Sequence, residues 1–236
     1  MSEWTAKRFW KQAETVAAEG GFGISLDGRP VKTPAKATLV VPMQSMAQAI
    51  AEEWDAQVEK IDPGTMPMTR AANAAIDKVA IQFDEVADML AAYGDSDLLC
   101  YRATDPQELI ARQVEQWDPM LDWADATFGV RLTTCAGVIH VPQDVKGQAR
   151  LAKELQVLTH FQLAAAHDLI SLSGSLIIAL AVMAKEVPPH EGWRLSRIDE
   201  DWQSEKWGDD DDANALAAIK KTAFLDAARF FDMSLT

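Results

Sequence analysis

The hydrophobic pattern of the chain changes from a strand period to a helical period near residue 42, and this change limits the possible folds most. Between residues 20 and 42, apolar residues alternate in short runs between glycines and prolines, as in Phe22–Leu26 before Asp27-Gly28. Such alternation is typical of strands, and Asp-Gly is a strong hairpin signal. From Met43 onward the apolar residues recur every three or four positions, which is the helical period. The pattern predicts an α+β protein, with a small antiparallel-β-containing N-terminal domain followed by a larger all-α domain.

The first 42 residues are expected to hold one helix and two or three short strands. A helix is predicted over residues 3–19, because Gly20-Gly21 is a natural C-terminal stop. The strands are predicted at 22–26, 31–33 and 38–41.

Helices are predicted for most of the remaining chain. The apolar positions from Met43 to Ile61 form one helical face. The Gly- and Pro-containing loop 62–67 marks the predicted boundary between a first domain, residues 1–66, and a second, residues 67–236. Further helices are predicted at 69–92, 105–128, 143–158, 159–186, 189–206 and 211–232. The stretch from Val130 to Val141 is expected to be extended.

Composition and charge exclude several classes of function. The 22 basic and 36 acidic residues give a net charge of −14, of which −2 falls in residues 1–66 and −12 in 67–236. Nucleic-acid binding is not expected, because it depends on basic groups that release counterions from phosphates. An anionic membrane surface is disfavoured for the same reason. The uncharged run 169–184 is shorter than the roughly 20 residues that a spanning helix needs, so a buried helix and no stable membrane insertion are expected.

Motifs for catalysis or metal binding are mostly missing from the sequence. Gly21, Gly23 and Gly28 fail the spacing of a dinucleotide fingerprint, and no phosphate-binding loop occurs. Ser173-Gly174-Ser175 lacks the flanking glycines of a nucleophile elbow, and we interpret it as small residues that let helices approach closely. The four histidines and two cysteines show no zinc or redox spacing. No cofactor and no bound metal are therefore expected.

One acidic segment that carries two tryptophans stands out, at residues 199–213. Leu195, Ile198 and Trp202 share a helical stripe and are expected to be buried, whereas Trp207 lies off that stripe and is expected to be partly exposed. The run Asp209–Asp212 is expected to cap the next helix and complement its dipole. Calcium loops need ligands at alternating positions, so a metal site is the less favoured interpretation.

Two interpretations of the acidic face remain open. Arg197 and Asp201 are four residues apart and can pair, but Glu205 then lies four residues from a like charge. This repulsion is easier to understand if Glu205 binds a partner, although a merely solvated face is equally compatible. A hydrolytic or metal-dependent enzyme that uses the Asp and Glu residues at 199–212 is the alternative function. An enzyme requires a deep pocket where carboxylates converge, and a chaperone requires a broad, shallow surface.

A series of short motifs runs in order along nearly the whole chain: Arg8-Phe9-Trp10-Lys11, Leu26 to Pro34, Ile50 to Gln57, Met66 to Arg70, Asp97 to Arg102, Gln116 to Pro119, Ser173 to Ser175 and Gln203 to Gly208. Together these motifs resemble the F1-ATPase alpha-subunit assembly chaperones. The resemblance implies a small β-containing domain before an all-helical one, no catalysis and no nucleotide cofactor. It also implies binding of free alpha subunit and shielding of the alpha surface that later meets the beta subunit.

The resemblance also suggests where the partner binds. It assigns partner binding to Glu200, Gln203, Glu205 and Trp207, and it gives residues 131–140 no role. Eukaryotic members of the family act in the mitochondrial matrix. This chain begins almost at the region shared by the family, so a bacterial member in the cytoplasm, acting as a monomer, is expected. An acidic, tryptophan-bearing binder could cover the apolar interface of a free subunit and keep it soluble.

Overall fold

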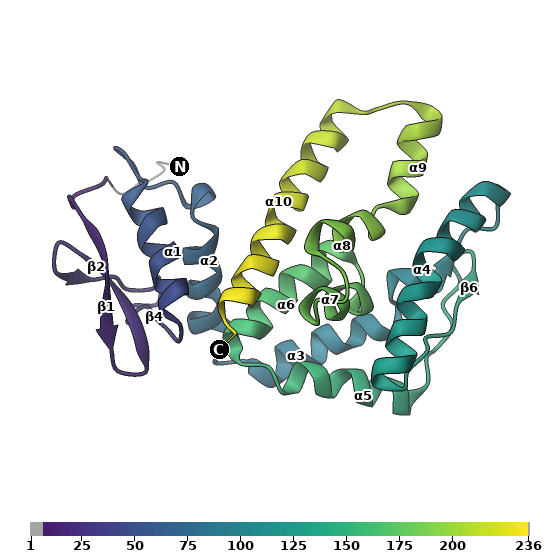
Figure 1. The fold of residues 1–236 in the computed structure, drawn as a ribbon, viewed down its shortest axis with the longest axis horizontal. Helices are drawn as coiled ribbons and strands as arrows, with labels where there is room; N and C mark the ends of the chain where they lie inside the picture. The colour runs from purple at the N-terminus through teal and green to yellow at the C-terminus, as the bar shows by residue number, and fades with distance from the viewer. Residues whose placement is uncertain (1–6, 236) are drawn as a thin grey trace. The chain divides into compact units, whose positions relative to one another are not determined.

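The computed structural model describes residues 7–235 and has the predicted α+β class (Figure 1). The strands are β1 (Ala13–Ala18), β2 (Gly21–Leu26), β3 (Arg29–Pro30), β4 (Val40–Val41), β5 (Tyr101–Arg102) and β6 (Cys135–Ala136). The helices are α1 (Gln44–Asp55), α2 (Pro67–Ala74), α3 (Phe83–Ala91), α4 (Gln107–Phe128), α5 (Val145–Gln156), α6 (His160–Ser173), α7 (Leu176–Met183), α8 (Pro189–Leu195), α9 (Ile198–Trp207) and α10 (Asp211–Met233). β1 to β4 form one antiparallel sheet around β2, and β5 pairs with β6 in parallel.

The helix predicted over residues 3–19 is wrong. Residues 13–18 form β1, which pairs antiparallel with β2 so that Ala18 lies opposite Gly21. Gly20 has a φ of +84°, so the two glycines turn the chain between two strands and do not end a helix. Pairing with the buried strand that follows in sequence outweighs the local helix propensity of this segment. The start of the predicted helix, at residues 3–6, lies outside the described residues.

The hairpin predicted at Asp27-Gly28 is confirmed. Leu26 lies opposite Arg29, and both turn residues have positive φ, +48° and +81°, as a type I′ turn requires. The Asp27 carboxylate also accepts hydrogen bonds from the backbone N–H groups of Lys11 and Gln12, at 2.9 and 3.0 Å. These two bonds hold the pKa of Asp27 below its ordinary value and fasten the turn to the segment before β1.

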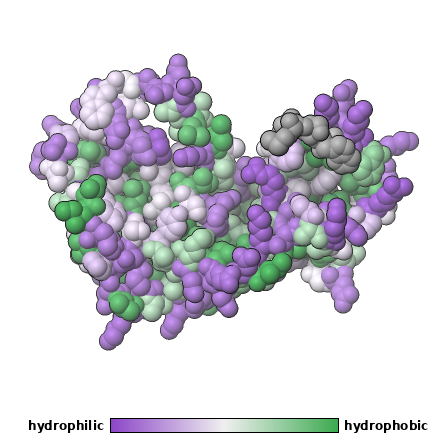
Figure 2. Space-filling view, turned by 180° about the vertical axis from the view of Figure 1, so that it is seen from behind, coloured by the Kyte–Doolittle hydropathy of each residue, from purple (hydrophilic) through white to green (hydrophobic). Residues whose placement is uncertain are grey.

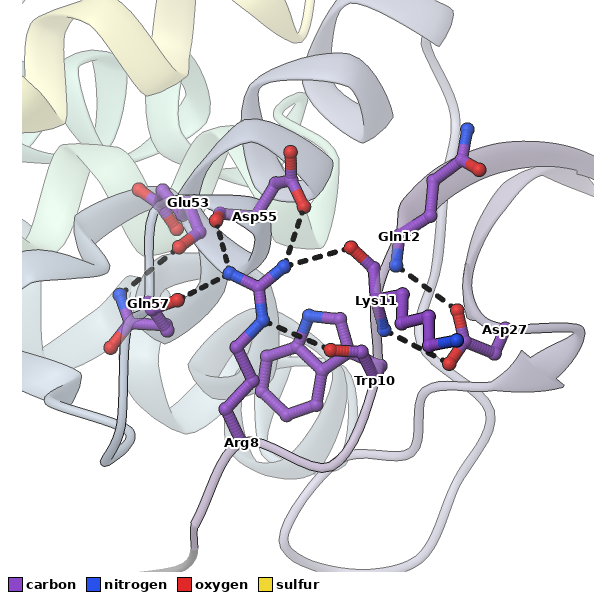
Figure 3. A network of polar contacts seen from close by, with 8 residues as sticks. All are labelled: Arg8, Trp10, Lys11, Gln12, Asp27, Glu53, Asp55 and Gln57. Carbon is purple, nitrogen blue, oxygen red and sulfur yellow. Dashed lines mark hydrogen bonds and ion pairs between the residues drawn. The ribbon is translucent and has the colours of Figure 1, made fainter.

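The helix predicted from Met43 to Ile61 ends earlier, at Asp55. The Arg8 guanidinium binds carbonyl groups at and just beyond the end of this helix, with Nη1 donating to the Asp55 carbonyl oxygen at 2.6 Å and also to the Gln57 carbonyl (Figure 3). Its Nη2 donates to the Asp55 carboxylate at 3.0 Å and its Nε to the Trp10 carbonyl at 3.0 Å. The bond to the Asp55 carbonyl satisfies an oxygen that has no partner within the helix.

The Glu53 carboxylate holds the start of α2. Its Oε1 accepts from the Met68 N–H at 2.6 Å, and its Oε2 accepts from the Thr69 N–H at 2.8 Å and from the Thr69 hydroxyl at 2.6 Å. A carboxylate at this position satisfies free N–H groups and complements the helix dipole. The motifs at 8–11, 50–57 and 66–70, on which the family resemblance partly depends, are therefore hydrogen-bonded to one another within the fold.

We predict that Glu53→Gln lowers the free energy of unfolding by about 1–2 kcal/mol, because an amide keeps one acceptor oxygen of the two and loses the charge at the helix start. Chemical denaturation of the purified chain measures this. Glu52→Gln is a matched control on an exposed neighbour, and equal losses in both variants would contradict the capping role of Glu53.

The chain forms two compact units in space. One holds the described residues up to Phe83 together with 159–165 and 229–235, and the other holds 84–158 and 166–228. The domain boundary predicted at residue 66 stays a prediction, because compactness in space does not define a boundary along the chain. The second unit contains 25 acidic and 12 basic residues, so it carries nearly all of the net charge.

Three predicted helices are broken. The helix predicted over 69–92 becomes α2, a π-helical segment at Ala75–Val79 and, after a turn at 80–82, α3. The helix predicted over 159–186 is interrupted at Gly174, which has a φ of +70°. The Ser175 hydroxyl oxygen then accepts from the Ile178 N–H at 3.0 Å and caps α7. Ser173-Gly174-Ser175 therefore ends one helix and starts another, a role that our interpretation of it as a close helix contact did not include. The helix predicted over 189–206 is likewise split, into α8 and α9, at Ser196-Arg197.

The remaining helices follow the pattern of the sequence. α5 and α10 lie close to their predicted ranges, and α7 is buried along residues 176–182, as expected for a core helix. Within residues 7–235, no helix has both the length and the apolar character needed to cross a membrane.

Candidate functional site

The acidic helix α9 is fixed to the second unit by the stripe predicted from its sequence. Leu195, Ile198 and Trp202 are all buried, which confirms that stripe. The Leu195 carbonyl accepts a 2.8 Å hydrogen bond from the indole N–H of Trp117, a completely buried residue of α4. α9 therefore lies along α4 with its apolar side inward and its charged side outward.

An arginine from α4 meets the outer side of α9. Arg112 donates two hydrogen bonds to the Glu205 carboxylate, both at 2.8 Å, in the planar two-bond geometry that favours arginine. Its guanidinium also lies over the Trp202 ring, 4.7 Å from the centroid, and the Lys206 ammonium lies 4.6 Å from the same ring. The Arg112 bonds hold the pKa of Glu205 below its ordinary value, so this carboxylate stays charged.

The first turn of α9 carries three more carboxylates. Arg197 pairs with Glu200 at 3.0 Å and reaches Asp201 at 3.9 Å, so the predicted pairing with Asp201 is present but weaker. The Asp201 pKa is raised, mainly by burial, and the like charge of Glu205 adds to that rise. Asp199 accepts a 2.6 Å hydrogen bond from the amide of Gln113, a buried residue of α4.

The end of α9 exposes its second tryptophan. Trp207 is 80% exposed, as expected for a residue off the buried stripe, and Gly208 follows with a φ of +96°. The Asp210 carboxylate accepts from the N–H groups of Asp212 and Ala213, at 2.9 and 3.1 Å. The interpretation of the aspartate run as a helix cap is confirmed for Asp210.

The first half of α10 adds apolar groups to this surface. Residues 211–222 are exposed or half-buried, and among them Leu216 and Ile219 are large aliphatic side chains that face solvent. Figure 2 shows hydrophobic side chains among hydrophilic ones on this part of the molecule. Acidic, aromatic and aliphatic groups are therefore exposed along α9 and the start of α10, and we call these exposed groups together the α9–α10 surface.

The four residues predicted to bind a partner lie on this surface, but they differ in their surroundings. Gln203 and Trp207 are exposed, Glu200 pairs with Arg197, and Glu205 pairs with Arg112. Sequence reasoning missed Arg112, which lies 93 positions from Glu205 and which no local pattern connects to it. It also missed the exposed Leu216 and Ile219, because an apolar spacing of three residues normally indicates a core face.

The carboxylates at 199–212 do not converge as an enzyme site requires. They are spread along the outside of α9 and the start of α10, and several are bound to arginine, to the Gln113 amide or to backbone N–H groups. In residues 7–235, no group of three or more histidine, cysteine or acidic side chains is placed to hold a metal ion. A broad surface matches the geometry that protein binding requires.

Comparisons with known proteins identify the family. A family model described as ATP12 chaperone protein matches residues 7–125, half of the chain. A crystal structure of Atp12 from Paracoccus denitrificans is 47% identical, covers 98% of this chain and 99% of its own, and superposes with a TM-score of 0.94. An aspartate-to-lysine mutant of the same bacterial protein superposes at 0.95, with 47% identity over 99% of this chain and 100% of its own. The mitochondrial atp12 protein of Schizosaccharomyces pombe is 27% identical over 89% of this chain and 76% of its own length.

A small antiparallel sheet, a helical body and a broad charged and aromatic surface place the molecule among protein-binding chaperones. The chain belongs to the ATP12 chaperone family. The resemblance drawn from the sequence motifs is thereby confirmed.

Proposed function

We propose that this chaperone acts in the assembly of the F1 sector of ATP synthase by binding free alpha subunit until the beta subunit replaces it. The observation that carries the proposal is the α9–α10 surface, which combines carboxylates with an exposed tryptophan and two exposed aliphatic side chains. Exposed aromatic residues are enriched at protein interfaces. The free subunit of an obligate complex exposes an apolar interface that such a surface can cover.

The proposed contacts are made by Glu200, Gln203, Glu205 and Trp207. Trp207 supplies the large exposed ring that typically anchors an interface, and Gln203 lies on the same exposed helix. Glu200 and Glu205 supply carboxylates that are held in place by Arg197 and Arg112, which favours basic groups on the client.

The same proposal covers compartment and mechanism. We place the chain in the bacterial cytoplasm, because the solved Atp12 structures that it resembles come from Paracoccus denitrificans, and we propose that it acts as a monomer. Shielding requires neither a cofactor nor a catalytic step, since the binding energy alone keeps the client surface covered.

The test is an aggregation assay with isolated F1 alpha subunit. The chaperone at an equimolar ratio should keep diluted alpha subunit in solution, as measured by light scattering, while isolated beta subunit should aggregate as before. Equal protection of both subunits, or of neither, would contradict binding that is specific for alpha.

A further inference from the structure

The segment 133–143 contains most of residues 131–140, which the family resemblance left without a role, and it forms a closed loop in the second unit. Both ends are held by one side chain: the Gln143 amide accepts from the Thr133 N–H at 2.7 Å and donates to the Thr133 carbonyl at 2.9 Å. Gln143 is buried, and its own N–H donates to the Asp95 carboxylate at 2.8 Å. A loop whose ends are fastened together in this way is an Ω-loop, a type of segment that is frequently functional.

The middle of this loop is also held in place. β6 pairs with β5 at its start, and the Gly137 N–H donates to the Arg102 carbonyl at 2.8 Å. His140 lies between two groups, with its Nε2 3.1 Å from the Asp95 carboxylate and its Nδ1 3.3 Å from the Tyr101 hydroxyl. The loop is thus ordered on both sides of its tip by contacts with the body of the unit.

The two residues at the tip are aliphatic and face solvent. Val138 is 90% exposed and Ile139 is 78% exposed, although both lie between the anchored positions Gly137 and His140. Figure 2 shows hydrophobic side chains at the edge of the molecule where β6 lies. Single exposed aliphatic residues are common, but two neighbours displayed by a fastened loop indicate a contact surface.

The charges around the tip indicate which partner fits. Asp95 supports His140, and Asp105 follows Thr104, whose side chain lies beside Gly137. Arg102, whose carbonyl binds the loop, is largely buried and pairs with Asp118 at 2.7 Å, and Arg131, which precedes the loop, pairs with Asp122. The surroundings are therefore acidic, and they complement an apolar depression with basic groups at its margin.

The loop is connected to the α9–α10 surface through a single buried side chain. The Gln113 amide oxygen accepts from the Ala103 N–H at 2.8 Å, directly after β5, and its nitrogen donates to Asp199 on α9 at 2.6 Å. The segment after β5, the strand that pairs with the loop, and the first turn of α9 are thus held by the two ends of one amide.

We propose that Val138 and Ile139 form a second contact for the client protein, inserting into an apolar depression bordered by basic groups. This inference rests on the proposed function, because it assigns to the same client a contact that neither the family resemblance nor the acidic helix supplies. The fastened loop keeps the two side chains in a binding-ready position, which lowers the entropy lost on association.

The test compares two double variants of the full chain for binding to isolated alpha subunit by calorimetry. Val138→Ser/Ile139→Ser should raise the Kd about tenfold, since two aliphatic contacts are lost from the interface, while the thermal melt stays unchanged. The matched control is Val58→Ser/Ile81→Ser, a valine and an isoleucine that are 81% and 73% exposed in the other unit, and its Kd should equal that of wild type. Hydrogen exchange should show protection of residues 137–141 in the complex.

The outcomes separate this inference from the proposed function. If wild type binds alpha and the Val138/Ile139 variant binds equally well, the loop is no contact and only this inference is overturned. If wild type does not bind alpha at all, the proposed function fails first. Self-association of wild type that the loop variant abolishes would show that a second copy of the chain occupies the tip, and this result would also overturn the inference.

Discussion

Glu205→Lys should raise the Kd for free alpha subunit on the order of 30-fold or more, because it removes a charge-paired contact and adds a repulsion at the same place. The structure adds a second consequence. The substitution removes the hydrogen bonds between Arg112 and Glu205. It also places a third positive charge beside Arg112 and Lys206, which both lie over the Trp202 ring. The thermal melt should fall slightly, since this ion pair is exposed and contributes little to stability.

A charge swap separates the two roles that Glu205 can have. In Arg112→Glu/Glu205→Arg the internal pair is rebuilt with its charges exchanged, so α9 should return to its position along α4 and the melt to its wild-type value. We expect alpha binding to remain weak, because the client then meets a cation where it met a carboxylate. Calorimetric titration beside thermal melting measures both effects. Recovery of binding in the swapped variant would make Glu205 a residue that only positions α9.

Local patterns sufficed for the parts of the fold that depend on neighbouring residues. The hairpin at Asp27-Gly28, the buried stripe of α9 and the aspartate cap of α10 are all decided within a few positions of the chain. Propensity and turn geometry act at that range. The exposure of Trp207 could be predicted for the same reason, because its angular position on α9 places it away from the buried stripe.

The parts that could not be predicted depend on contacts between distant segments. β1 has the composition of a helix, and only pairing with β2 makes it a strand. Arg8 binds the end of α1 at Asp55, 47 positions later in the chain, and Arg112 binds Glu205, which lies 93 positions later. The four candidate residues could be named from the sequence, but two of them are carboxylates in ion pairs. The loop tip at Val138 and Ile139 could not be recognised at all, because its exposure depends on the bonds of Gln143 and His140.

A buried carboxylate at the centre of the second unit should make stability depend strongly on pH. Asp97 is completely buried, and its carboxylate accepts from the N–H groups of Leu99 and Ile177, at 3.0 and 3.1 Å, which ties the start of α7 to the turn before β5. Burial raises its pKa to about 6 from the ordinary value of 3.8, and the backbone and Ser175 hydrogen bonds offset only part of that rise. Between these two pH values the folded protein holds a proton that the unfolded chain has released.

The sign of the effect follows from this difference. The contribution of Asp97 to stability is fully present below about pH 4 and is lost as the pH rises through about 6, a decrease of about 3 kcal/mol on the order-of-magnitude scale of such shifts. Asp97→Asn has no proton to release there, so the unfolding free energy of wild type minus that of the variant should fall by that amount between pH 4 and pH 7. Denaturant titrations of both proteins at several pH values measure it, and other titrating groups cancel in the difference. Asp88→Asn, at an exposed position of α3, should follow wild type across the same range. A difference between wild type and Asp97→Asn that stays constant with pH would show that the Asp97 carboxylate remains charged inside the folded protein, held by its backbone donors alone.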